Sequence, residues 1–272
     1  MSFRNQYIAL GYGIVKQVFT IDEVEQLRSA CDELCEMAKD FHTDQFIDQS
    51  FFNLHRNCDP FAKDLEAHPQ ITGELRRVSY PYRVSKIFNF MRQNPKLLEH
   101  VQILLGPDLN QIVNQVNFNP PKQGTGWGWH QDYRFRKAGI EDMRNNFVQT
   151  ITAIDPCSPI NGGLRLIPES DQLGHLQLDK EHDQIKKYVD ESKAIAPELQ
   201  PGDVVFFNPF IVHGSLPNLS NQLRRVYING YANAHTSTIG KPVLRDGSVV
   251  FDDQSPMEYE FAPQILEKSS KY

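Results

Sequence analysis

Residues 202–215 read GDVVFFNPFIVHGS, and this stretch sets the expected fold class. The apolar run Val204–Phe207 indicates a buried strand, the Asn-Pro pair after Phe207 marks a turn, and a second β-rich run leads to His213. Similar short runs, separated by Gly, Pro, Asn and Asp, lie at residues 111–118, 147–154, 163–167 and 226–231. Several short strands with turn signals between them predict a mainly β protein whose core is a jelly roll or barrel.

The part of the chain before residue 109 indicates flanking α-helices. Residues 20–23 read TIDE, the form of a capping box, and apolar residues then recur every three or four positions up to Ala38. A second helix is expected over residues 95–105, where a Gly-Pro pair follows as a stop signal. Residues 41–78 are polar and are interrupted by two prolines, which indicates loops and short helices.

We expect a single domain over residues 1–272, a length that is ordinary for one all-β unit. Its helical N-terminal part would cover about residues 1–108, and its jelly-roll core about residues 109–235. The stretch 169–200 is charged and helix-permissive and lies between two predicted strands. We interpret this stretch as an inserted lid.

The composition argues against several classes of protein. The net charge of -6 is spread along the chain, whereas binding of nucleic acid needs clustered Lys and Arg. No apolar run is long enough to span a membrane, and the N-terminus lacks the apolar segment of a secretory signal. Cys31 and Cys35 stand at helical spacing, and we interpret them as small core residues. We therefore expect a cytoplasmic protein that binds neither nucleic acid nor membranes.

Two His-x-Asp triplets are candidates for metal binding. Alternate residues of an extended segment point to the same side, so an imidazole and a carboxylate can reach one metal. His42 and Asp44 follow the first helix in a polar stretch, and we interpret them as structural or exposed. His130 and Asp132 follow a predicted strand and a Gly-rich aromatic turn, near the mouth of the expected barrel, where ligand sites are common. The second triplet is therefore favoured.

His213 is the best candidate for a third ligand. It ends an apolar run, where a histidine is explained either by metal ligation or by a backbone hydrogen bond in the core. Two histidines and one carboxylate are typical ligands of non-haem iron(II) oxygenases. Arg224 follows eleven residues later (224 − 213). Its planar guanidinium suits the distal carboxylate of a 2-oxoacid, with a surface charge as the alternative.

Together these residues resemble the phytanoyl-CoA dioxygenase (PhyH-like) family. The similarity spans about residues 6–232 and rests on residues 11–15, 130–132, 161–164, 202–203 and 213–224. The last segment reads HGSLPNLSNQLR and is specific, whereas His-x-Asp by itself is weak. The chain departs from the family at residues 168–171, which read PESD where Pro-Gly-Ser-His is usual. We expect this departure to affect the lid and its substrate contacts.

The resemblance implies a double-stranded β-helix core, the cupin-like jelly roll, with iron(II) at its mouth. Three residues would bind the iron: His130, Asp132 and His213. Arg224 would bind the far carboxylate of 2-oxoglutarate. Four further residues would contact this co-substrate: Ser215, Gln115, Asn117 and Lys86. The carboxylate of Asp132 favours hydroxylation, because related halogenases carry a small residue in its place.

The resemblance also implies the reaction, in which a dioxygenase uses O2 to hydroxylate an unactivated C–H bond and releases succinate and CO2. No basic patch for coenzyme A is present, so we expect a small metabolite as substrate, in natural-product biosynthesis. Candidate substrate contacts, with the core or rim as the alternative, are Trp129, Arg134 and Phe135. Trp127 is interpreted as core. The alternatives are an acyl-CoA or amino-acid hydroxylase of the same family, a cupin-type metal enzyme independent of a 2-oxoacid, and a non-catalytic jelly-roll binding protein.

Overall fold

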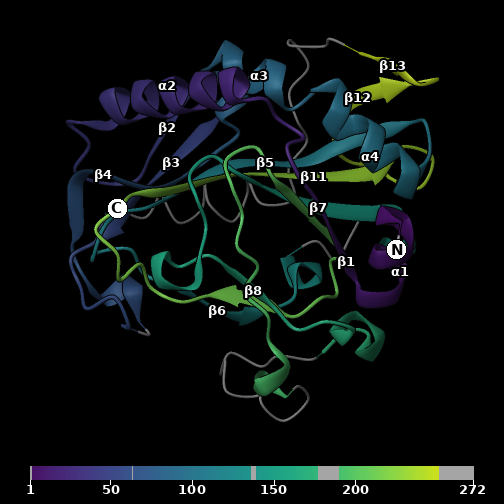
Figure 1. Cartoon of the computed structure of the whole chain (residues 1–272). Coiled ribbons are helices and arrows are strands. Elements are labelled where there is room, and N and C mark those ends of the chain that lie inside the picture. The colour runs from purple at the N-terminus through teal and green to yellow at the C-terminus, as the bar shows by residue number, and fades with distance from the viewer. Residues whose placement is uncertain (1, 63, 136–138, 177–189, 251–272) are drawn as a thin grey trace.

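Two antiparallel sheets face each other, and helices cover the outer side of the larger one (Figure 1). The computed structural model describes residues 2–62, 64–135, 139–176 and 190–250. The α-helices are α1 (Phe3–Leu10), α2 (Ile21–Ala38), α3 (Lys86–Met91), α4 (Pro95–Leu105) and α5 (Met143–Asn146). The strands are β1 (Tyr12–Val15), β2 (Gln45–Ile47), β3 (Ser50–Arg56), β4 (Gln70–Ser79), β5 (Leu109–Asn119), β6 (Trp127–His130), β7 (Phe147–Ala153), β8 (Leu164–Leu166), β9 (Val204–Phe207), β10 (His213–Ser215), β11 (Arg224–Asn233), β12 (Lys241–Arg245) and β13 (Ser248–Val249).

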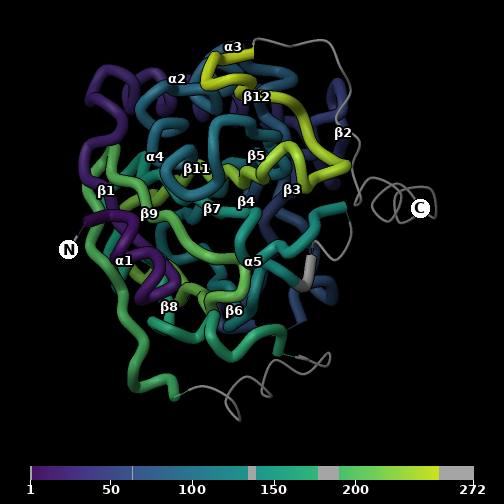
Figure 2. Tube along the Cα trace, turned by 90° about the vertical axis from the view of Figure 1, so that its right-hand side faces the viewer, coloured from purple at the N-terminus to yellow at the C-terminus, as the bar shows by residue number. Residues whose placement is uncertain are grey.

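The larger, main sheet has the strand order β1-β9-β7-β11-β5-β4-β3-β2, and β12 and β13 extend it beside β5. The smaller, minor sheet has the order β6-β10-β8. Figure 2 shows α2, α3 and α4 on one side of the main sheet and the minor sheet on the other. The expected mainly β jelly roll with flanking helices is confirmed.

β11 shows how the main sheet is buried on both faces. Successive side chains of a strand point to opposite faces. Val226 and Ile228 pack between the two sheets. Tyr227 and Tyr231 pack toward the helices, where the Tyr227 hydroxyl donates to the carbonyl oxygen of Phe88 in α3 at 3.1 Å. This two-sided burial explains why the apolar residues Val226, Tyr227 and Ile228 follow one another directly in the strand.

Both predicted helices are present. The Thr20 hydroxyl accepts a hydrogen bond from the Glu23 amide at 3.2 Å, and the Glu23 carboxylate accepts one from the Thr20 amide at 2.7 Å. This capping box begins α2, whose inner face buries Cys31 in the helical core. α4 ends at Gly106, which has a positive φ of 92°. All four cysteines are free thiols, and Cys31 is buried, in agreement with the interpretation of Cys31 and Cys35 as small packing residues.

The interpretation of residues 41–78 as loops and short helices is wrong, because β2, β3 and β4 lie there and join the main sheet. In β4, Arg77 lies opposite Asn117 of β5. At the other edge, Tyr12 of β1 lies opposite Phe207 of β9. These pairings connect residues far apart in the chain. Polar strands such as β2, β3 and β4 carry no local alternation of apolar residues from which the sequence could predict them.

The predicted lid at 169–200 lies partly outside the described residues, because residues 177–189 are not described. On either side of them stand two short 3₁₀ helices, η5 (Ser170–Leu173) and η7 (Glu191–Lys193). Ile195 then forms an isolated bridge with Leu166 of the minor sheet. Within the described ranges, no helix has both the length and the apolar character that a membrane crossing requires.

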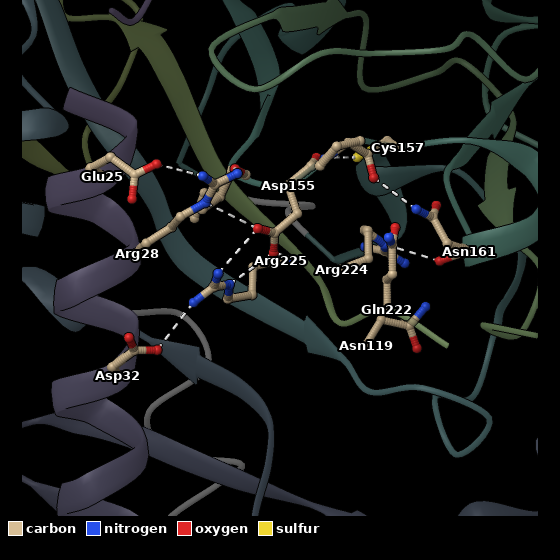
Figure 3. Close-up of polar contacts among 12 residues, drawn as sticks. Glu25, Arg28, Asp32, Asn119, Asp155, Cys157, Asn161, Gln222, Arg224 and Arg225 are labelled. Atoms are coloured by element: carbon tan, nitrogen blue, oxygen red, sulfur yellow. Dashed lines mark hydrogen bonds and ion pairs between the residues drawn. The ribbon is translucent and has the colours of Figure 1, made fainter. Parts of the chain in front are cut away.

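Asp155 joins the main sheet to α2 (Figure 3). Its carboxylate accepts hydrogen bonds from the amide and the Nε of Arg225 at 2.9 and 2.8 Å. It also accepts one from Nε of Arg28 in α2 at 3.2 Å. A second partner of Arg225, Asp32, has a side chain that is 77% exposed, against 10% for Asp155. Asp155 is therefore the carboxylate that compensates the partly buried charge of Arg225.

We predict that Asp155→Ala lowers the free energy of unfolding by about 3–5 kcal/mol, because it leaves a partly buried arginine without its carboxylate. Asp32→Ala is the matched control and should cost less than about 1 kcal/mol, because its ion pair is exposed to solvent. Urea denaturation followed by circular dichroism measures both changes. Equal losses for the two variants would contradict the assigned roles.

Candidate active site

Three predicted ligand residues converge at the mouth of the two sheets. His130 is the last residue of β6, and His213, the first residue of β10, lies opposite it in the minor sheet. Asp132 begins the 3₁₀ helix η3 (Asp132–Phe135). Its Oδ1 lies 3.6 Å from Nε2 of His130 and 3.7 Å from Nε2 of His213. Across the described part of the chain, this is the one group of three such side chains whose ligand atoms lie within 4.8 Å of one another.

Backbone contacts orient both histidine rings. Nδ1 of His130 lies 2.8 Å from the carbonyl oxygen of Gly128, and Nδ1 of His213 lies 3.1 Å from that of Ile211. A carbonyl can only accept, so each Nδ1 carries the proton and each Nε2 keeps its lone pair toward Asp132. Two imidazole lone pairs and a carboxylate that face one another suit a divalent cation. This donor set is that of non-haem iron(II).

Gln131, between two of the ligands, holds the turn that brings them together. Its buried amide donates to the carbonyl oxygens of Gly174 and Phe210 at 2.8 and 2.6 Å and accepts from the Leu176 amide at 2.9 Å. His130 ends strand β6, and Asp132 begins η3 two residues later. The predicted convergence of the triplet is present. His42 of the other triplet is exposed and contacts Thr72 at 3.0 Å, as expected for a structural residue.

Arg224 is buried on the face of β11 that looks toward the minor sheet. Its guanidinium donates to the carbonyl oxygens of Asn161 and Gly162 at 3.4 and 2.5 Å (Figure 3). Burial lowers the pKa of this arginine, and it forms no ion pair with a carboxylate of the described residues. A buried cation without a counter-charge is costly, so the arrangement suits a bound anion.

Asn119, which the sequence did not single out, lies opposite Arg224 on β5. Both polar atoms of its buried side chain lack a hydrogen-bond partner among the described residues. Gly162 allows this approach: a Cβ added there would lie 2.5 Å from Nδ2 of Asn119 and 2.6 Å from the carbonyl oxygen of Leu216. An unpartnered amide beside a buried guanidinium fits a carboxylate such as the distal end of 2-oxoglutarate.

Three of the four predicted co-substrate residues lie on the surfaces that face each other. Asn117 and Gln115 lie opposite Val226 and Ile228 of β11, whose side chains pack between the sheets. Ser215 shares a face of β10 with His213, because the two are separated by one residue. It accepts a hydrogen bond from the Trp127 amide at 3.2 Å. Ser215 thus lies along β10 between the histidine pair and the Gly162 loop that holds Arg224.

Lys86 is not brought to this site. It is exposed at the start of α3, and α3 packs on the outer face of the main sheet through Phe88 and Tyr227. The sheet therefore separates Lys86 from the three metal-ligand candidates. The family resemblance that suggested this lysine took no account of the three-dimensional position of the helix.

Trp129 points away from the site as well. Between the pairs His130–His213 and Trp127–Ser215, two residues of β6 oppose one of β10, which is a bulge. The bulge puts Trp127 on the inner face with His130. The interpretation of Trp127 as a core residue leaves out this position on the inner face. Trp129 instead packs with a small outer cluster and under the guanidinium of Arg165, 4.6 Å from its ring centre. Arg134 and Phe135 lie in η3, and their side chains fall outside the described part of the structure.

The unusual turn at residues 168–171 supports the site in spite of its sequence. Glu169 adopts the left-handed φ of 63° that favours glycine, the residue usual there in the family. Ser170 accepts from the Val212 amide at 2.8 Å, next to His213. Asp171 pairs with Arg144 at 3.2 Å. The turn thus holds the strand that carries His213, the candidate third ligand.

A jelly roll with two histidines and one carboxylate at its mouth defines the class of iron- and 2-oxoglutarate-dependent oxygenases. The family model for phytanoyl-CoA dioxygenase (PhyH) matches residues 8–226. The chain belongs to this family, whose relatives and structural neighbours are 2-oxoglutarate-dependent dioxygenases.

Known proteins share this architecture. A methylphosphonate hydroxylase of Gimesia maris is 34% identical over 122 residues, which cover 45% of this chain and 45% of that protein. The match therefore spans less than half of its length. A probable alpha-ketoglutarate-dependent hypophosphite dioxygenase of Stutzerimonas stutzeri is 22% identical over 248 residues, covering 85% of this chain and 78% of that one. A crystal structure of EctD from S. alaskensis, with 2-oxoglutarate and 5-hydroxyectoine, has a TM-score of 0.67 and 18% identity and covers 91% of this chain and 87% of the other.

We predict that alanine in place of His130, Asp132 or His213 weakens Fe(II) binding by more than about 100-fold, since loss of an outer-sphere partner alone costs about 10–100-fold. Anaerobic isothermal titration measures the affinity. His42→Ala is the matched control, because it removes a histidine of the other triplet and should leave the affinity unchanged. Wild-type affinity in the Asp132→Ala variant would disprove the ligand assignment.

Proposed function

We propose that this chain is a hydroxylase that couples oxidative decarboxylation of 2-oxoglutarate to oxidation of a C–H bond in a small polar metabolite. The convergence of His130, Asp132 and His213 carries the proposal, because this donor set holds iron(II) and leaves ligand positions open. When bound, the iron would supply the activation of O2, with succinate and CO2 as products of the co-substrate.

The chain's own residues would bind and orient the co-substrate. Arg224 and the amide of Asn119 would hold its distal carboxylate. Ser215 would contact it between the metal and Arg224, and Asn117 and Gln115 would line the opposite sheet. The inner faces of the two sheets would exclude water from the reacting centre.

A small substrate is supported by what the relatives act on. Two of them are named for methylphosphonate and hypophosphite, which are small and polar. Tailoring of a natural product, the role expected from the sequence, stays a prediction. Outside the interior of the two sheets, no cluster of cations among the described residues supports binding of an acyl-CoA substrate.

The first experiment adds Fe(II) and then 2-oxoglutarate to the purified protein without O2. We expect a weak metal-to-ligand charge-transfer band in the visible spectrum, and release of succinate when O2 is admitted. Failure to bind iron or to form the band would favour a non-catalytic jelly-roll protein. Turnover without 2-oxoglutarate, kept in Arg224→Ala, would favour a cupin-type metal enzyme.

We predict that Arg224→Met weakens 2-oxoglutarate binding by about 100-fold, because truncation of a buried, hydrogen-bonded charge costs about 2–5 kcal/mol. Its iron affinity should stay that of the wild type. Arg225→Met is the matched control: the neighbouring arginine points to the opposite face of β11 and contacts Asp155. This control should lower stability and leave 2-oxoglutarate affinity unchanged, so the reverse pattern would refute the assignment.

A further inference from the structure

Two consecutive arginines of β4, Arg76 and Arg77, both face the interior between the sheets. Arg77 lies opposite Asn117, which in turn lies opposite Val226, whose side chain packs between the sheets. Directly opposed residues in antiparallel strands share a face, so Arg77 is on the inner side. The guanidinium of Arg76 lies 4.0 Å from the ring centre of Trp127, which belongs to the minor sheet.

A β-bulge explains how neighbouring side chains share one face. In β3, Asn53 lies opposite Arg77 and Leu54 lies opposite Leu75, so Arg76 is the extra residue of β4. Strict alternation would send Arg76 toward the helices, where Leu75 packs. Bulges re-aim side chains in this way and are frequent beside active sites. A second bulge, in β6, turns the side chain of Trp127 toward Arg76.

No described carboxylate pairs directly with this arginine pair, and Asp44 attracts both charges only from a distance. Nε of Arg76 and Nε of Arg77 are buried without a hydrogen-bond partner among them, and neither guanidinium forms an ion pair with a described carboxylate. Asp44, the nearby acid, accepts from the Leu54 amide at 2.8 Å and from Nδ2 of Asn53 at 3.0 Å. Burial, and then repulsion by Arg77, lowers the pKa of Arg76 to about 10, so the side chain of Arg76 stays charged at neutral pH.

We propose that Arg76 and Arg77 form an oxyanion subsite for the primary substrate and that Trp127 holds Arg76 in place. Two adjacent guanidinium groups match a doubly charged tetrahedral oxyanion of the phosphonate type, because each planar fork can bind two of its oxygens. The subsite deepens the proposed function and rests on it, since it gives that hydroxylase its substrate class.

The position of the pair separates it from the 2-oxoglutarate residues. Arg77 and Arg224 lie two strands apart and two residues out of register, which puts their Cα atoms about 12 Å apart. Trp127 is three residues before His130 on β6, so its Cα lies within about 10 Å of the metal ligand. An anionic head at the arginine pair would therefore leave the rest of a small substrate within reach of the metal.

The experiment measures methylphosphonate binding by anaerobic isothermal titration at pH 8 to the protein loaded with Fe(II) and 2-oxoglutarate. We expect Arg76→Met and Arg77→Met each to weaken binding by about 10–100-fold, since a hydrogen bond to a charged group contributes about 1.5–3 kcal/mol. Arg77→Lys, which keeps the charge, should recover part of the loss. Arg165→Met is the matched control, because Arg165 stacks on the outward-facing Trp129, and it should change the affinity less than about twofold.

Acetate and dimethyl sulfone test the charge and shape of the ligand. Acetate should bind more weakly than methylphosphonate. The affinity for uncharged dimethyl sulfone should be the same in the wild type and in the arginine variants. Acetate binding as tight as methylphosphonate binding would overturn the assignment to a doubly charged tetrahedral anion. The assignment would also be overturned if Arg76→Met or Arg77→Met raised the dissociation constant of 2-oxoglutarate as much as Arg224→Met does. The pair would then belong to the co-substrate site.

Thermal unfolding separates ligand binding from a structural role. Since the two charges repel each other without compensation, Arg77→Met should not lower the melting temperature, whereas a structural role would. If the charge-transfer band forms and methylphosphonate does not bind, the subsite is overturned and the proposed function stands. If methylphosphonate binds through the arginines and the band never forms, the subsite stands and the proposed function fails.

Discussion

The backbone pairing of His213 with His130 in the minor sheet is the contact on which the active site depends. It joins residues that are far apart in the chain and sets the separation of two metal-ligand candidates to that of neighbouring strands. The surroundings then fix each side chain: backbone carbonyls orient the rings, and Gln131 holds the turn that brings in Asp132. The main sheet packs behind this framework and carries the groups that would hold the co-substrate.

Charge compensation distinguishes the structural arginines of this protein from those proposed to bind ligands. Arg225 is held by Asp155 and Asp32, and its charge is satisfied within the fold. Its neighbour Arg224, on the other face, has only backbone carbonyls as partners among the described residues. Arg76 and Arg77 likewise lack a described carboxylate partner. Such uncompensated cations reduce stability, and a bound anion would offset that loss.

Bulges in β4 and β6 shape the side of the interior away from Arg224. Each inserts one residue into a strand and reverses the alternation of the residues beyond it. The first brings Arg76 to the interior, and the second brings Trp127 there. Strict alternation from Arg77 and His130 assigns both side chains to the opposite faces.

The sequence by itself determined the jelly-roll class and four candidate residues for the central chemistry: His130, Asp132, His213 and Arg224. Their residue types, their spacing and the specific block at 213–224 carry this information locally. Only the tertiary structure decided which further side chains reach the interior. It places Lys86 in the helical layer and Trp129 on the outer face. It adds Asn119, Trp127 and the arginine pair to the interior. The physical reason is that strand pairing and bulges between distant segments set the direction of a side chain, and no local pattern encodes them.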